Sequence, residues 1–190
     1  PGLLVELMGG VSAAITQPAY VVASWSDQGL HLRGTIEAWR RMSSKQKWLD
    51  VHGQKKWAHY YHEQSRERRL AFFDHFLRDR PTSVAAWPPV RIEIRECAGK
   101  QEEREEQEFP LARTEYRNLY LDGATGQLTQ AVPDDAVLRQ DAVEGMATFD
   151  VTFDQPTEIT GHCALTLWVE AEGSNGLGEE LWKLFGGWKS

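Results

Sequence analysis

The chain has 190 residues, 41% hydrophobic and 26% charged, which is enough for one ordinary globular domain or two small ones. Its formal net charge of −7 argues against a nucleic-acid partner, because phosphate binding needs a concentrated positive field. No apolar run approaches the roughly 20 residues of a membrane span, and the opening residues lack a basic leader. We therefore expect a soluble, cytoplasmic protein with no membrane partner.

The first half of the chain alternates strand and helix patterns, which is typical of an α/β layer with parallel strands. Short runs of apolar and β-branched residues predict strands over Ala19–Ser24 and Lys47–His52. Apolar residues that recur every three or four positions predict helices over residues 29–43 and 64–77. The charged run at residues 66–69 is expected to face solvent. The buried face of the second helix is predicted to hold Leu70, Phe73, Phe76 and Leu77.

The composition changes after Arg80, where prolines mark a linker and the helical periodicity gives way to strand patterns. Apolar and charged residues alternate with period two in Val90–Cys97, which predicts a half-exposed strand. The charged segment Lys100–Glu108 is expected to be an exposed hairpin or loop. Further strand patterns occupy residues 117–121, 147–153 and 159–172. Such a run of antiparallel strands without helices indicates a β-sandwich or jelly roll, here incomplete.

The predicted fold class is thus α/β followed by all-β. Residues 1–79 are expected to form the α/β part and residues 80–190 the β-sandwich part. The segment Gly178–Ser190 does not fit an all-β region, because its apolar residues have the spacing of a short amphipathic helix.

Candidate catalytic residues follow the two predicted parallel strands. Asp27 comes shortly after the first strand, and His52 ends the second. Because the carboxyl ends of parallel strands meet at one edge of a sheet, we expect the two side chains to face each other there. Asp27 would then orient His52, which would act as general base and afterwards as general acid. Structural roles are the alternative, such as Asp27 capping the helix that begins near Gly29.

Several motifs in a fixed order resemble one family of enzymes. These motifs are PAYVVASWSDQGLHLRGTIEAWRRM, KWLDVHGQKKWAHYY and RRLAFFDHFLRDRP, followed by VRIEIRE, FPLARTEYRNLYLD and FDQPTEITGHCALTLWVEAEG. Over residues 15–173 the chain resembles the cocaine-esterase-like acyl hydrolases and the X-Pro dipeptidyl-peptidases. The resemblance implies the late part of an α/β-hydrolase domain followed by the early strands of a carboxy-terminal jelly roll.

The resemblance also implies roles for individual residues. Asp27 is the aspartate of a Trp-x-Asp sequence at the end of the first strand, and it corresponds to the triad acid. His52 corresponds to the triad base. His59 is a rival for the base, because Trp57-Ala58-His59 is similar to the end of the histidine segment in some relatives. Trp25 and Trp57 flank these positions and are candidates for either an acyl pocket or the core.

The sequence contains no Gly-x-Ser-x-Gly elbow, so a recognisable nucleophilic serine is missing. We expect a serine-hydrolase fragment that is inactive alone and that acts on an acyl ester or Xaa-Pro peptide when an amino-terminal part completes it. The alternatives are a non-catalytic β-sandwich that binds carbohydrate or protein, and a gene fragment or altered chain with no evolved function of its own. Exposed apolar surface left by missing strands predicts self-association.

No cofactor or metal is expected, because the histidines and carboxylates show no tight ligand spacing. His59 and His62 lie three residues apart, and we interpret them as a pair on a helix surface.

Overall fold

A computed structural model describes residues 12–27, 31–97, 100–141, 145–168 and 170. The described residues fall into two compact units, one that runs up to Ala112 and one that begins at Arg113. Each unit is described by itself below.

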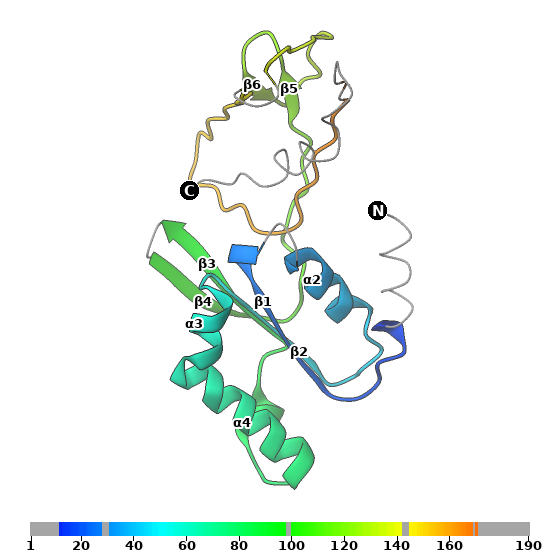
Figure 1. Ribbon diagram of the computed structural model, residues 1–190, viewed down its shortest axis with the longest axis vertical. Helices are drawn as coiled ribbons and strands as arrows, with labels where there is room; N and C mark the ends of the chain where they lie inside the picture. Colours follow the sequence, from blue (N-terminus) through cyan, green and yellow to red (C-terminus); the bar gives the residue numbers. More distant parts are fainter. Residues whose placement is uncertain (1–11, 28–30, 98–99, 142–144, 169, 171–190) are drawn as a thin grey trace. The chain divides into compact units, whose positions relative to one another are not determined.

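A four-stranded sheet forms the centre of the first unit (Figure 1). Its strands lie in the order β1 (Ala19–Ser24), β2 (Lys47–His52), β3 (Val90–Cys97) and β4 (Lys100–Glu106). The first three strands are parallel to one another, and β4 is antiparallel to β3. The strands predicted at 19–24, 47–52 and 90–97 are therefore confirmed. The charged segment after Gly99 is the second strand of a β3–β4 hairpin.

One face of the sheet packs on helix α2 (Leu32–Arg41). Ile36 and Trp39 from this helix join Leu49 and Val51 of β2 in a cluster of buried apolar side chains. Each fully buried aliphatic side chain of this kind stabilises the fold by roughly 2 kcal/mol. The predicted apolar stripe of this helix is confirmed at both of its buried positions.

The other face of the sheet is covered by α3 (Lys56–Tyr61) and α4 (Glu63–Arg78), as Figure 1 shows. Phe72 of α4 packs on Tyr20 of β1 and Trp48 of β2, with ring centroids 6.0 and 6.1 Å apart. Because alternate residues of a strand point to opposite faces, Trp48, Asp50 and His52 all lie on this side. The sequence did not predict α3.

The predicted buried face of α4 is wrong at three of its four positions, whereas the fourth, Phe76, does pack on Trp48 of β2. Leu70, Phe73 and Leu77 are 56%, 52% and 76% exposed. The stripe of α4 that covers the sheet and His59 has helical spacing and consists of Ser65, Arg68, Phe72 and Phe76. Arg69, beside this stripe, contacts Tyr60 of α3. This stripe contains a serine and an arginine because the surface it covers carries polar partners, His59 and Asp50, which apolar periodicity cannot reveal.

The second unit contains a β-hairpin of β5 (Tyr120–Asp122) and β6 (Gln127–Thr129). Its turn is held by Asp122, which accepts hydrogen bonds from the amides of Ala124 and Thr125. Gly126 follows with a φ of +69°, a conformation that glycine adopts without strain.

The strands predicted over residues 147–153 and 159–172 do not form among the described residues of this unit. Asp150 makes one isolated bridge to Gln127, and residues 159–168 belong to no strand. Alternating apolar and polar residues predict which side chains share a face of a strand. A strand forms, however, only where a neighbouring strand makes hydrogen bonds with its backbone N–H and C=O groups. The helix predicted at 178–188 lies outside the described residues.

Candidate active site at the carboxyl edge of the sheet

His52 is the last residue of β2 and lies beside Ser24, the last residue of β1. Its side chain is almost fully buried, with 2% of the residue exposed. The Nδ1 atom of His52 is buried and has no hydrogen-bond partner among the described residues. The sequence therefore predicted the position of this imidazole at the carboxyl edge, and the structure adds that its Nδ1 atom is buried without a hydrogen-bond partner in the part of the chain that it describes.

Asp27 lies at the same edge, at the end of the short 3-10 helix Trp25–Asp27 that follows β1. Its Oδ2 atom forms a salt bridge with Nζ of Lys56, at 2.6 Å. The structure thus brings Asp27 and His52 to one edge of the sheet but joins the carboxylate to a lysine rather than to the imidazole. Asp27 is not the cap of α2, because His31 occupies that position.

His59 comes from α3 and stacks on His52. The two imidazole rings are parallel within 2°, and their centroids are 3.7 Å apart. The Nε2 atom of His59 shares a 3.1 Å hydrogen bond with Oγ of Ser65, and both residues are buried. The interpretation of His59 and His62 as a surface pair is therefore wrong for His59. A helix of only six residues gives too short a pattern to tell its buried side from its exposed side.

A buried ion pair lies on the same face of the sheet, two residues before His52. Asp50 accepts a hydrogen bond from the hydroxyl of Tyr20 at 2.7 Å and one from Nη1 of Arg68 at 3.0 Å. Nη2 of Arg68 also binds Glu103 on β4, at 2.8 Å. The side chain of Arg68 is only 12% exposed, so the prediction that residues 66–69 face solvent is wrong for this residue. The alternation of side chains along β2 could have indicated this, since it places Asp50 on the same face as His52. A carboxylate on that face needs a cationic or hydrogen-bonding partner.

The electrostatic surroundings keep the two imidazoles neutral. Burial, with a smaller contribution from repulsion between protonated rings of His52 and His59, lowers the pKa of His52 to about 4, and the charge of Asp50 and the backbone of Gln54 oppose this shift. Burial also lowers the pKa of His59, against the same opposing effect of Asp50. Burial and then the negative charge of Asp50 raise the pKa of Tyr20, so its hydroxyl remains a donor to that carboxylate. At neutral pH the pair can therefore accept a proton but carries no charge.

Hydrogen bonds between the loops fix this edge of the sheet. The hydroxyl of Ser24 donates to the carbonyl of Gln54, and the hydroxyl of Ser26 donates to the carbonyl of Gly53, each at 2.8 Å. The amide of Gly53 in turn donates to a carboxylate oxygen of Glu93 at 2.7 Å. The loops after β1 and β2 are thus tied to each other and to β3.

The two tryptophans beside the candidate residues differ in environment. The indole of Trp25 donates to the backbone carbonyl of Glu93 and packs against Phe109, as a core residue would. Trp57 is 66% exposed. Neither residue lines the cavity described next.

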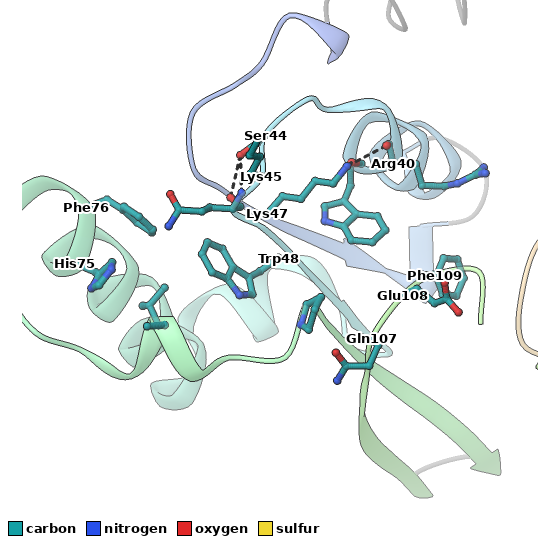
Figure 2. Close-up of a pocket in the computed structure, with 15 residues that line it drawn as sticks. Arg40, Ser44, Lys45, Lys47, Trp48, His75, Phe76, Gln107, Glu108 and Phe109 are labelled. Carbon is teal, nitrogen blue, oxygen red and sulfur yellow. Dashed lines mark hydrogen bonds between the residues drawn. The ribbon is translucent and has the colours of Figure 1, made fainter. Parts of the chain in front are cut away.

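A cavity of about 680 Å³ lies at the opposite edge of the sheet, where β2 and β3 begin (Figure 2). Trp48 and Phe76 form part of its wall together with Lys47. The ammonium group of Lys47 is occupied, because it donates to the carbonyls of Trp39, Arg40 and Met42 at the end of α2. This cavity contains neither Asp27 nor His52, so it is separate from the candidate site.

Within the described residues, no cluster of three or more histidine, cysteine or acidic side chains could hold a metal ion. In the same part of the chain, no helix is both long enough and apolar enough to cross a membrane.

The fold, a mixed sheet with helices on both faces, can be compared with known proteins. Residues 82–177 match the family model of the X-Pro dipeptidyl-peptidase C-terminal non-catalytic domain. The chain belongs to the X-Pro dipeptidyl-peptidase and cocaine-esterase-like family.

Two solved structures of a CocE/NonD family hydrolase from Staphylococcus aureus are similar to this chain. One is 38% identical with a TM-score of 0.60, and the match covers 63% of this chain and 22% of that one. The other is 39% identical with a TM-score of 0.58, and it covers 61% of this chain and 21% of that one. The chain thus spans about a fifth of the length of these relatives. A comparison with curated proteins found no match.

Proposed function

We propose that the chain forms part of a serine hydrolase for acyl esters or Xaa-Pro peptides, in which His52 is the general base and Asp27 is the carboxylate that orients it. The nucleophilic serine comes from a polypeptide segment outside these 190 residues. The observation that carries the proposal is the buried, neutral imidazole of His52 at the carboxyl end of a parallel strand, with an unoccupied Nδ1 atom.

The chemistry needs two partners for the imidazole. A carboxylate bound at Nδ1 fixes the tautomer and stabilises the imidazolium that forms when Nε2 takes the serine proton. Asp27 can fill this role if its carboxylate leaves Lys56 and binds His52 once the segment with the serine is present. His59 is the weaker candidate for the base, because its Nε2 atom already binds Ser65.

Complementation tests this proposal. The chain is mixed with an amino-terminal polypeptide of the family that carries a Gly-x-Ser-x-Gly elbow, and hydrolysis of a chromogenic acyl ester is measured. We expect His52→Gln to lower kcat by about 10³-fold or more and Asp27→Asn to lower it by a comparable factor. His31→Gln changes an exposed histidine near the same edge and serves as the matched control. Complementation without a loss in His52→Gln would overturn the assignment, as would a failure of every such mixture to hydrolyse ester.

A second function is favoured by the family match itself, because the model that covers residues 82–177 describes a non-catalytic domain. We propose that the part of this region after Arg113 binds carbohydrate or protein, as β-sandwich modules often do. Its apolar residues Leu165 and Leu167 are 48% and 37% exposed, which supports such a contact.

Binding of the full chain to glycan and protein arrays tests this second function. Leu165→Ser with Leu167→Ser should abolish retention, while His52→Gln should leave it unchanged. Retention that depends on His52 instead would favour the hydrolase site. The exposed side chains of Leu165 and Leu167 also predict that the chain self-associates, because apolar surface tends to bind apolar surface. A monodisperse monomer in sedimentation velocity would contradict this prediction.

A further inference from the structure

Two buried imidazoles in face-to-face contact form the most unusual side-chain arrangement of the first unit. The ring of His52 is fixed on one side by the ring of His59, 3.7 Å away and parallel within 2°. A rotation of His52 about its side-chain bonds would break this contact between two buried rings. The stack therefore restricts the plane in which the nitrogen atoms of His52 lie.

His59 is itself held in place. Its Nε2 atom and the hydroxyl of Ser65 share a 3.1 Å hydrogen bond, and Ser65 lies in the first turn of α4, where it is buried. The orientation of the His52 ring thus depends on a chain of contacts that runs from α4 through α3 to the end of β2.

The stack also limits the charge that the pair can carry. Two imidazolium ions with ring centroids 3.7 Å apart would repel each other strongly in a buried site, so a second proton on the pair is disfavoured. The negative charge of Asp50 would attract a proton to either ring, but that carboxylate is already bound by Arg68 and Tyr20. From α4 and the residue before it, the positive charges of Arg68 and Arg69 and the ring of His62 oppose protonation of His59. The groups that face the pair therefore favour two neutral rings.

We propose that His59 is a positioning residue for the hydrolase site: anchored by Ser65, it holds the ring plane of His52 through the stacking contact. This inference rests on the proposed role of His52 as general base. In this proposal His59 acts through its contact with His52 and takes no part in the proton transfer itself. A general base needs a fixed ring plane, since a tilted imidazole cannot take the serine proton.

Imidazole NMR of the full chain tests this inference without any nucleophile. The nitrogen resonances of His52, assigned by their loss in His52→Gln, report its tautomer and titration midpoint. In His59→Ala we expect the midpoint to rise by about one pH unit and the two tautomers to mix, because water enters beside the ring. In His59→Phe, which keeps a flat ring in the stack, we expect a smaller rise and a single tautomer. Ser65→Ala should fall between these two variants.

His75→Phe is the matched control, because it makes the same substitution far along α4 from His52. It should leave the signals of His52 unchanged. An unchanged midpoint and tautomer of His52 in His59→Ala, with the fold retained by circular dichroism, would overturn the inference. So would equal effects of His59→Phe and His59→Ala, because the ring would then not matter.

The pH profile of the complemented enzyme separates this inference from the function on which it rests. His59→Ala should shift the acid limb of kcat upward by the same amount as the NMR midpoint. If His52→Gln retains activity while His59→Ala still moves the NMR signals of His52, the proposed function fails and the positioning contact stands. If His52→Gln is inactive but His59→Ala changes neither the NMR midpoint nor the acid limb, the positioning role alone fails.

Discussion

The two units of the chain differ in what they do with their apolar residues. In the first unit, Leu49, Val51 and Ile92 are almost completely buried between the sheet and α2. In the second unit, Ile159, Leu165 and Leu167 occupy an equally regular alternating pattern and remain exposed. The difference is that the first set has neighbouring strands and a covering helix, whereas the second has neither among the described residues. An apolar pattern thus stabilises a fold only where another element covers it.

Breaking the buried ion pair should have the largest effect on the first unit. Arg68→Ala leaves the carboxylate of Asp50 buried without its cation, and we expect the free energy of unfolding to fall by about 3–5 kcal/mol. Arg78→Ala, on the same helix, breaks an exposed pair with Asp74 and should cost less than about 1 kcal/mol. Urea denaturation followed by tryptophan fluorescence measures both. Equal costs would show that the pair with Asp50 is not desolvated.

Leucine truncation compares the two units directly. Leu49→Ala should lower the free energy of unfolding by about 2–5 kcal/mol, because it opens a cavity in the core. Leu165→Ala removes the same atoms from an exposed position and should change it by less than about 0.5 kcal/mol. The measurement is chemical denaturation of each variant. A large cost for Leu165→Ala would mean that the second unit is covered in solution and would remove the contrast.

Acid should weaken the first unit through His52. The pKa of its imidazole is about 4 in the folded chain and about 6.5 when unfolded, so the unfolded state binds more protons between these values. The free energy of unfolding should therefore fall as the pH drops from about 6.5 to about 4, by at most about 3 kcal/mol. His59 acts in the same direction.

The contribution of His52 is the difference between wild type and His52→Gln, measured at pH 7 and pH 5, where few ordinary carboxyl groups titrate. The variant should lose less stability over this range than wild type. Equal losses would show that the imidazole is hydrated in the folded chain.

The sequence predicted the parts of the fold that depend on local pattern. Strands β1, β2 and β3 have apolar runs or strict alternation, so their positions in the sequence could be predicted. Their parallel pairing then places the residues that end β1 and β2 at the same edge of the sheet. The contacts of α4 could not be predicted, because its buried stripe includes Ser65 and Arg68, whose partners lie on other elements. The apolar content of a helix shows which side prefers to be buried only when the surface opposite is apolar too.

The candidate site shows the same limit. The strand ends placed Asp27 and His52 at one edge, but the salt bridge of Asp27 with Lys56 depends on the path of the loop after β2. The stacking of His59 depends on the short helix α3, which has too few residues for a clear period. The catalytic roles of Asp27 and His52 remain predictions for the complementation assay.

The pairing of β2 with β3 has a consequence for how this protein can be divided. The family match begins at residue 82, yet β3 and β4 complete the sheet of the first unit, where Val51 lies beside Ile92. A cut at the start of the matched region would remove the neighbour of β3 and uncover its apolar side chains. A cassette exchanged between relatives should therefore begin near Arg113, where one compact unit gives way to the next, rather than where the family match begins.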